Sequence, residues 1–408
     1  MTPTFDRRAP AKRNAVVLSA ALAINGAAAP IVISLGGLAG AGMLGTDKSL
    51  ATLPISGYGI GLALGAMPAA LLMRRVGRRV GFIGGACIGI AAMLAASFAL
   101  TLGNFWFFCL ALLVGGSASA FVQQYRFAAA DQGDEAFRAK AISWVMFGGI
   151  GAAIIGPQTA LFTRDMLAPT PFAGAFLAAA GLMVIGIVVL SRLRFSRPLS
   201  RHRANQVGCR PIGVIVRQPR FIVAVICAIS SYALMSFVMT GAPLAMVHHG
   251  HSTDQAMLGI QWHVLSMYTP SFFTGHLIVR FGKERIVAIG LSLLGLCAVT
   301  NIAGIELWNF WTSLILLGIG WNFGFIGATA MLTETYSDAE RSHVQGLNDL
   351  LVFGSAATAS LLSGQALSAF GWSAVNWLMF PVITLCLASL LGLYWLERRK
   401  LRRGGSEQ

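Results

Sequence analysis

The chain alternates between long apolar stretches and short polar segments that hold most of its charges. Twelve of the stretches lack Lys, Arg and Glu, and only one of them contains an Asp. Each is long enough to cross the membrane as a helix, because about 20 residues span the roughly 30 Å of hydrocarbon. We therefore predict twelve membrane-spanning helices over residues 15–38, 50–72, 80–101, 104–125, 141–163, 172–191, 221–243, 256–279, 286–305, 308–332, 345–368 and 374–396.

The composition agrees with this pattern and excludes other classes of protein. Hydrophobic residues make up 56% of the 408 positions and charged residues only 11%, whereas ordinary soluble domains are about 25% charged. A soluble or disordered chain needs more charge than this. The six cysteines are scattered without a CxxC pair, so neither a disulfide framework nor a zinc site is expected. The predicted fold class is an all-α polytopic membrane protein.

The positions of the positive charges predict how the chain is oriented. With the N-terminus in the cytosol, all of the 30 Lys and Arg residues except Lys48 and Arg164 fall on the cytosolic side. Positive charge is retained on that side of membranes, so both termini are predicted to be cytoplasmic. Topology also explains the net charge of +15, and no nucleic-acid partner is expected. A cleaved signal peptide is the alternative for the first stretch, but it would leave eleven spans.

A basic segment and a repeated turn divide the chain into two halves. We expect a six-helix bundle over 1–191, a basic cytoplasmic linker over 192–220, and a second bundle with a cytoplasmic tail over 221–408. The turn after the second stretch recurs after the eighth. Arg75 and Gly77 in the first copy correspond to Arg280 and Gly282 in the second, at the same spacing along the chain. Such a repeat is typical of internally duplicated transporters.

At these turns the chain resembles the major facilitator superfamily, whose loop motif is G-x-x-x-D-R-x-G-R-R. The resemblance covers nearly the whole chain. It implies two six-helix bundles around a central cavity, alternating access in a bacterial inner membrane, and lipid-facing third, sixth, ninth and twelfth spans. Arg74 and Val279 replace the motif's Asp in the two copies, and Ala70 replaces its opening Gly in the first. The fourth span also lacks the Arg that drug exporters of the superfamily often carry, which weakens an efflux interpretation.

Few polar side chains occur near the predicted midplane, where a transporter's site is expected. A polar group facing lipid costs free energy, so each should face a cavity or a neighbouring helix. The alternative role for each is a helix–helix hydrogen bond, worth about 0.6 kcal/mol in membranes. His263, in the outer third of its span, is also a candidate proton carrier, since imidazole titrates near neutrality. The candidate substrate-binding residues are Asn25, Tyr232, Ser236, Gln261, His263, Tyr268, Trp321 and Asn322.

Asp349 is the only charged residue inside a predicted span, near its cytosolic end. It can be an interfacial acid, a proton carrier or one partner of a gate. In the superfamily, the motif Asp after the second span faces the start of the eleventh. Here the acid stands on the eleventh span instead, so we hypothesise that Asp349 pairs with Arg74 or Arg75. The candidate gating residues are Arg74, Arg75, Gly77, Arg280, Gly282 and Asp349. The nearby acids Glu334, Asp338 and Glu340 are expected to be solvated.

These features together predict a secondary transporter rather than an enzyme. The chain contains no GxSxG, HExxH or phosphate-loop motif, so neither catalysis, ATP use, a cofactor nor a bound metal is expected. We expect transport to be coupled to an ion, with a proton as the first candidate. The protein is expected to act as a monomer in the lipid bilayer. Flat aromatic rings beside neutral amides, without a charge at that depth, suit a neutral planar solute with a polar edge.

Two segments resemble a bacterial branch of the superfamily that includes riboflavin-uptake transporters. They read IQWHVLSMYTPSFFTGHLIVRFG and HVQGLNDLLVFGSAATASLLSG. Riboflavin is a neutral, planar solute with a polar edge, so the predicted function is riboflavin uptake by alternating access. The alternative is proton-coupled efflux of a drug or metabolite by a transporter of the same superfamily.

Overall fold

The computed structural model describes the chain except for residues 1–7, 131–134, 195–209, 338–339 and 405–408. Within the described residues, every regular element is a helix. The first half contains α1 (Arg8–Asn25), α2 (Ala28–Met43), α3 (Leu53–Val76), α4 (Arg78–Thr101), α5 (Phe105–Gln123), α6 (Tyr125–Ala130), α7 (Glu135–Thr163) and α8 (Ala173–Leu190). The second half contains α9 (Ile212–Ile215), α10 (Pro219–His248), α11 (Thr253–Tyr268), α12 (Ser271–Phe281), α13 (Lys283–Ala303), α14 (Leu307–Leu332), α15 (Arg341–Trp377) and α16 (Met379–Gly404).

The helices account for twelve membrane crossings. Ten segments of the described chain are long and apolar enough to span a membrane, and the first of them, Ala11–Met43, joins α1 and α2. The last, His343–Arg398, turns at Gly371, where φ is 76°, and therefore crosses twice. Helices α11 and α12 are each too short to span, but they follow one another across Thr269 and Pro270 and together make one more crossing. The predicted all-α fold with twelve spans is confirmed.

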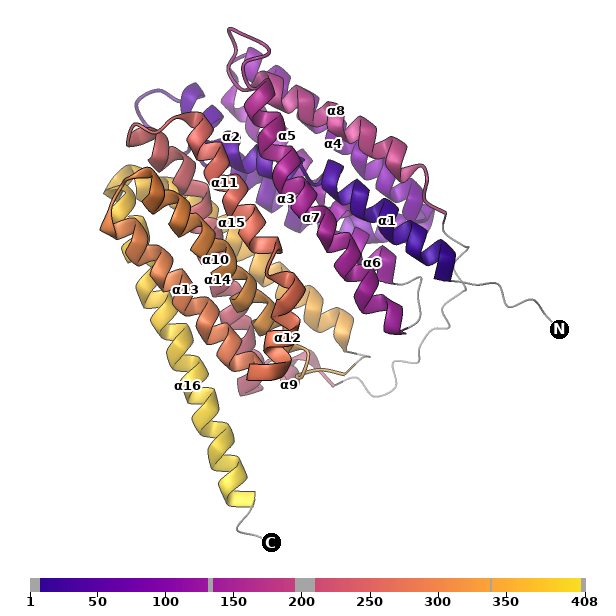
Figure 1. Ribbon diagram of the computed structural model, residues 1–408, viewed down its shortest axis with the longest axis vertical. Helices are drawn as coiled ribbons and strands as arrows, with labels where there is room; N and C mark the ends of the chain where they lie inside the picture. Colours follow the sequence, from indigo (N-terminus) through magenta and orange to yellow (C-terminus); the bar gives the residue numbers. More distant parts are fainter. Residues whose placement is uncertain (1–7, 131–134, 195–209, 338–339, 405–408) are drawn as a thin grey trace, which may run out of the picture.

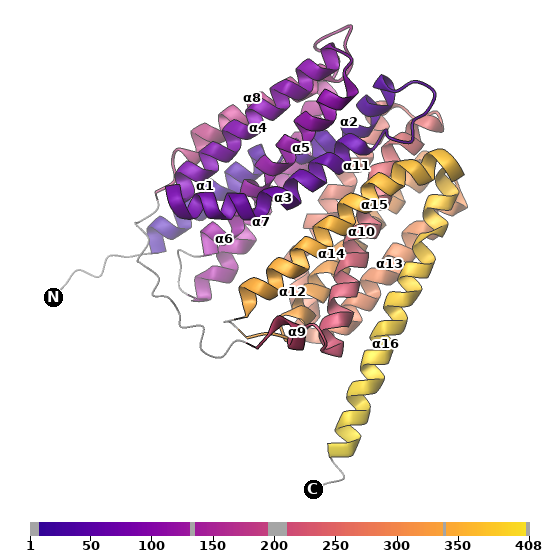
Figure 2. The same cartoon turned by 180° about the vertical axis from the view of Figure 1, so that it is seen from behind.

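The helices form two bundles that follow the order of the sequence (Figures 1 and 2). Helices α1 to α8 pack on one another, and α10 to α16 form the other bundle. The bundles meet where α3 packs on α15, α7 on α11, and α2 on α10 and α11. Both views show the bundles closest near α2 and α11 and further apart towards the start of α1 and the end of α16. We call that latter end of the molecule the basic end and the opposite one the far end.

The repeated turn has the same backbone conformation in both bundles. Gly77 adopts φ 85° and ψ 157°, and Gly282 adopts φ 89° and ψ 153°. Each glycine ends one helix by donating its N–H to the carbonyl of Met73 (3.0 Å) or Ile278 (2.9 Å), and the next helix begins directly after it. Residues with a Cβ disfavour positive φ, so glycine is required at both positions. The repeat found in the sequence therefore builds one structural turn twice.

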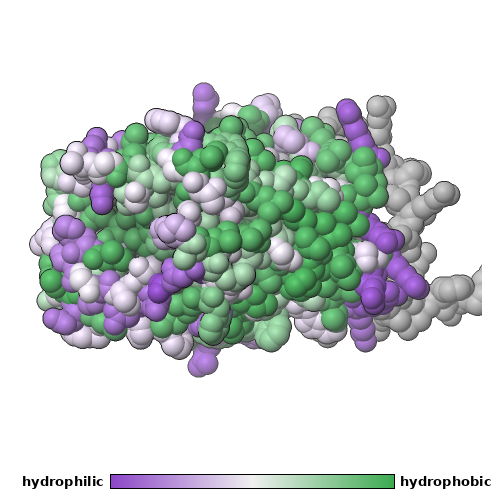
Figure 3. All heavy atoms as spheres, turned by 90° about the horizontal axis from the view of Figure 1, so that it is seen from above, coloured by the Kyte–Doolittle hydropathy of each residue, from purple (hydrophilic) through white to green (hydrophobic). Residues whose placement is uncertain are grey.

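The outer surface is apolar around the middle of the molecule. Large hydrophobic side chains are exposed on α4, α8, α13 and α16, the helices that correspond to the third, sixth, ninth and twelfth spans; Phe98, Val188 and Leu385 are examples. Figure 3 shows hydrophobic residues across the middle of one face and hydrophilic residues towards its ends. In water such a surface would be unfavourable, whereas lipid tails solvate it.

Ion pairs hold the second bundle together at the basic end. Arg220 on α10 pairs with Glu334 after α14 and with Glu397 on α16, each at 2.6 Å. Glu340 is buried and accepts hydrogen bonds from the Arg210 guanidinium at 2.8 and 2.9 Å, which hold the pKa of this carboxyl well below its usual range. The expectation that Glu334 and Glu340 are merely solvated was wrong, because both acids neutralise arginines that lie against the bundle. Asp338 lies outside the described residues.

Candidate functional site

A cavity of about 190 Å³ lies between the two bundles. The first bundle contributes α1, α2, α3, α5 and α7 to its wall, and the second contributes α10, α11 and α15. None of its lining residues, all within the described part of the chain, is charged. The wall is mostly apolar, and its polar members are Tyr58, Ser119, Gln123, Tyr232, Ser236, Thr240, Tyr268 and Ser360.

Two helix breaks adjoin this cavity. The chain turns at Gly26 between α1 and α2, and Pro30 follows one turn later; both residues line the cavity. On the opposite side Tyr268 ends α11, just before the Thr269–Pro270 break. Irregular backbone at membrane depth is tolerated where it lines a cavity or is buried in protein, since lipid cannot satisfy free peptide groups. Both breaks are therefore placed where they can shape the cavity.

On the side of the first bundle, Tyr58 and Gly149 line the cavity. The Tyr58 hydroxyl on α3 is hydrogen-bonded to the Ser119 hydroxyl on α5. Gly149 on α7 faces Tyr268, and a Cβ at this position would lie only 3.1 Å from the tyrosine ring. The absence of a side chain at Gly149 therefore lets Tyr268 of the second bundle approach the backbone of α7.

The wall of the second bundle is an aromatic cluster centred on Tyr232. Its ring meets those of Trp321, Phe325 and Phe353 edge to face, with centroids 5.3 to 5.4 Å apart. Trp321 and Phe325 are stacked at 5.4 Å with an interplanar angle of 14°. Offset and edge-to-face packing of this kind is favourable and fixes ring orientations. The cluster therefore holds the Tyr232 ring in place at the cavity wall.

One cation lies close to this wall. Arg126, on the short helix α6, interacts electrostatically with Tyr232 and Tyr268 and with Asp349 on α15. It belongs to the first bundle, whereas its three partners belong to the second. Arg126 thus brings positive charge to the cavity's surroundings, although the lining itself is uncharged.

The bundles are joined by hydrogen bonds and an ion pair towards the far end. Ser56 on α3 donates to Ser360 on α15 at 3.1 Å. Gln158 on α7 donates to Gln261 on α11 at 2.8 Å, and Arg164 pairs with Asp254. The Thr52 hydroxyl, just before α3, also donates to the Leu361 carbonyl of α15 at 3.4 Å. These contacts hold the two bundles together on the far side of the cavity.

Comparison with known proteins decides the family. The family model of the Major Facilitator Superfamily matches residues 14–300 and 264–408. The chain belongs to the major facilitator superfamily. It is 50% identical over 381 residues to the riboflavin transporter RfnT of Brucella anthropi, covering 93% of this chain and 96% of the relative. It is 30% identical to the uncharacterized MFS-type transporter YdeG of Bacillus subtilis, over 90% of this chain and 88% of that relative.

A crystal structure of a mutant of the nucleoside transporter NupG has the same fold. The two structures agree with a TM-score of 0.72 over 94% of this chain and 100% of the other. Their sequences are 14% identical, so this likeness concerns the fold alone. It supports the arrangement of two bundles around a central cavity that the resemblance to the superfamily implied.

Three of the predicted substrate-binding residues line the cavity between the bundles. They are Tyr232, Ser236 and Tyr268. The Ser236 hydroxyl donates to the Ala356 carbonyl at 2.9 Å, so its hydrogen is already engaged. The two tyrosines approach the cavity from α10 and α11, with their rings held by neighbouring groups. These three residues stay candidates for substrate contact.

Two further candidates lie away from the cavity lining. Asn25 is buried inside the first bundle, where its amide donates to the Tyr125 hydroxyl at 3.1 Å and its side chain packs on Gly186 of α8. Gln261 accepts the bond from Gln158 that joins the two bundles. Both therefore make the helix–helix hydrogen bonds that were the alternative role for each polar residue.

The remaining candidates lie on α11 and α14. His263 is buried, and its Nδ1 lies 2.8 Å from the Leu314 carbonyl. Asn322 is buried and donates to the Met267 carbonyl at 2.7 Å. The Trp321 ring packs edge to face against the Tyr232 ring, with centroids 5.4 Å apart. These side chains build the scaffold of the second bundle in this conformation.

The predicted gating residues are spread over three places. Gly77 and Gly282 form the repeated turns, and Arg280 stacks on Phe281 at 5.3 Å. Asp349 accepts a hydrogen bond from Asn348 at 3.3 Å and forms no ion pair with Arg75. Arg75 instead lines a groove on the outside of the first bundle. The side chain of Arg74 lies outside the described residues, so its hypothesised pair with Asp349 stays a prediction.

Sequence reasoning missed several residues around the cavity. Tyr58, Ser119 and Gln123 line it from the first bundle, and Arg126 lies beside it. Tyr58 and Gln123 stand inside predicted spans, so an inventory of every polar residue in the spans would have found them. Arg126 directly follows the predicted fourth span and resembled an ordinary boundary charge. Its interaction with residues of the second bundle arises only from the folded arrangement.

Proposed function

We propose that this protein imports riboflavin across the bacterial inner membrane by alternating access, with the basic end in the cytoplasm. The observation that carries the proposal is the 50% identity, over 93% of the chain, to a protein named as a riboflavin transporter. Positive charge concentrated at one end of the molecule supports the proposed orientation.

The chemistry of the cavity is compatible with a flavin. Tyr232 and Tyr268 present aromatic surfaces, and an isoalloxazine ring is flat and can stack on such surfaces. Ser119, Gln123 and Thr240 offer neutral donors and acceptors to the polar edge of the ring and to the ribityl hydroxyls. The uncharged lining suits a neutral solute, because a buried unpaired ion would be strongly disfavoured.

The candidate substrate residues divide into two proposed groups. Tyr232, Ser236 and Tyr268 are proposed to contact the substrate directly, together with the newly found Tyr58 and Gln123. Asn25, Gln261, His263, Trp321 and Asn322 are proposed to position those residues, or to reach the substrate in another state of the cycle.

A gate at the basic end is the second part of the proposal. Asp349 on α15 interacts electrostatically with Arg126 of the first bundle. When the bundles approach one another at this end, Arg126 is the proposed partner of Asp349, with Arg74 and Arg75 as the alternatives from the loop motif. A proton is the proposed coupling ion, carried by an acid such as Asp349.

The test uses a bacterial riboflavin auxotroph that lacks its own importer. Expression of the chain should restore growth on low external riboflavin and should accumulate labelled riboflavin. Tyr232→Ala and Tyr268→Ala should each raise the KM for uptake about fivefold, since one aromatic contact is worth about 1 kcal/mol. Tyr394→Ala is the matched control, because Tyr394 is exposed on α16 away from the cavity.

Three outcomes would contradict parts of the proposal. If the protein reaches the membrane but neither restores growth nor accumulates the label, riboflavin is not the substrate. If expression instead lowers the internal riboflavin of a wild-type host, the direction is efflux. If a protonophore leaves uptake unchanged, a proton is not the coupling ion. Membership of the superfamily does not depend on any of these results.

A further inference from the structure

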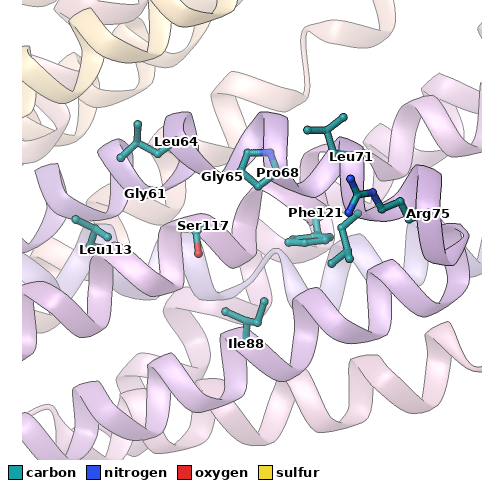
Figure 4. A pocket seen from close by; sticks show the side chains of 11 residues that line it. Gly61, Leu64, Gly65, Pro68, Leu71, Arg75, Ile88, Leu113, Ser117 and Phe121 are labelled. Atoms are coloured by element: carbon teal, nitrogen blue, oxygen red, sulfur yellow. The ribbon is translucent and has the colours of Figure 1, made fainter.

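A second, larger hollow lies on the outside of the first bundle, apart from the central cavity. It is a groove of about 540 Å³ in the fork between α3 and α4, with α5 as its floor (Figure 4). The tight turn at Gly77 closes the fork at the basic end. Leu64, Leu71 and Ile88 line it and are exposed, so the groove opens to the outer surface of the protein.

Two glycines on α3 allow close packing on the floor of the groove. A Cβ at Gly61 would lie 1.9 Å from the Leu113 carbonyl oxygen of α5, and one at Gly65 would lie 2.7 Å from the Ser117 Cα. Helix α3 therefore rests directly on the backbone of α5 at these two turns. Both glycines also line the groove, which therefore runs along this line of contact between α3 and α5.

The walls of the groove are apolar along their length. The only hydroxyl in the lining, that of Ser117, donates to the Val114 carbonyl at 2.7 Å and is thereby satisfied. Apart from Arg75 at one end, the lining therefore offers no free hydrogen-bond donor. It does suit a hydrocarbon chain, which needs only van der Waals contact.

One positive charge stands at the basic end of the groove. Arg75 lines the groove and is exposed, and it makes no hydrogen bond or ion pair with the residues that the structure describes. No Asp or Glu occurs anywhere between Lys48 and Ala130, so α3, α4 and α5 supply no acid to neutralise it. Figure 4 shows the guanidinium beside Phe121 at the closed end of the fork.

We propose that this groove binds an anionic phospholipid, with an acyl chain along α3 and the phosphate at Arg75. The length fits: the segment from Gly61 to Arg75 extends about 21 Å at 1.5 Å per residue, and one leaflet contributes about 15 Å of hydrocarbon. The charge fits as well, because basic residues next to membrane helices attract anionic lipids. A zwitterionic lipid would fill the apolar part without neutralising Arg75.

The experiment measures lipid retention on the purified full-length protein by native mass spectrometry. Delipidated protein is mixed with equal amounts of phosphatidylglycerol and phosphatidylcholine of the same acyl chains. The wild type should retain phosphatidylglycerol preferentially. Arg75→Gln should reduce this preference about fivefold, which corresponds to about 1 kcal/mol for one basic residue. Arg217→Gln, which removes an exposed arginine before α10, should leave the preference unchanged.

A second variant tests the apolar part of the groove without changing any charge. Ile88→Trp places an indole into the groove from α4 and should reduce retention of both lipids. Millimolar inorganic phosphate should not displace the bound lipid, which distinguishes a phospholipid site from a site for free phosphate. Equal retention of the two lipids by the wild type would overturn the proposal. The same loss in Arg217→Gln as in Arg75→Gln, or no loss in Ile88→Trp, would overturn it too.

Discussion

Substituting Asn322 tests whether this buried polar residue binds the substrate or stabilises the break between α11 and α12. Its amide donates to the Met267 carbonyl and to the Ser271 hydroxyl, each at 2.7 Å, and accepts from the Thr274 hydroxyl at 2.6 Å. The three partners flank the break between α11 and α12, where Pro270 has no N–H to offer to the preceding turn. The side chain therefore replaces interactions that a continuous helix would make with its own backbone.

The magnitude follows from the number of bonds. A helix–helix hydrogen bond in a membrane protein is worth about 0.6 kcal/mol, so Asn322→Ala should lower the free energy of unfolding by about 2 kcal/mol. With an unfolding entropy of about 2.1 cal/mol/K per residue, this corresponds to a fall in Tm of about 2 °C for a chain of this length. Thr274→Val removes one of the three bonds and keeps the side-chain shape, so its effect should be about a third as large.

The assay combines thermal unfolding of the purified protein in detergent with the KM for riboflavin uptake. We expect Asn322→Ala to lower Tm and the amount of protein in the membrane, and to leave the KM of the surviving protein close to the wild-type value. An unchanged Tm with a KM raised severalfold would refute this reasoning and would return Asn322 to the substrate site.

Two further predictions concern the gate and the orientation. Arg126→Asp and Asp349→Arg should each impair uptake, and the double exchange should recover part of it. A coupling energy near zero in this double-mutant cycle would show that the two residues do not interact during transport. In a background without the six native cysteines, a cysteine replacing Gly45 should react with an impermeant thiol reagent on intact cells, and one replacing Gly213 should react only after lysis. The reverse pattern would invert the proposed topology.

The fold was predictable because the membrane restricts the choices of the chain. Apolar length alone identifies the crossings, since only a helix satisfies its own peptide groups in lipid. The repeat of Gly77 and Gly282 identifies the duplicated turn, because positive φ leaves glycine as the favoured residue. Both signals are local in the sequence and do not depend on how distant helices pack.

The site was less predictable because depth in the membrane does not determine which way a side chain points. Asn25 and Tyr232 stand at similar predicted depths, yet Asn25 bonds to Tyr125 inside its bundle while Tyr232 lines the cavity. The direction depends on helix rotation, which is set by contacts between helices far apart in the sequence. Arg126 was missed for the same reason, since its nearness to Asp349 arises only where the two bundles face each other.

The distribution of acids gives a physical reason why one carboxylate matters at the basic end. In the second bundle Arg220 and Arg210 have carboxylate partners within the described chain. In the first bundle α3, α4 and α5 contain no acid, and Arg75 and Arg79 are exposed at its turn. Bringing this positive surface against the second bundle would cost free energy unless a negative charge met it. On the proposed cycle Asp349 is placed on α15 to supply that charge, so neutralising it should disfavour the state closed at the basic end and slow the return of the empty carrier.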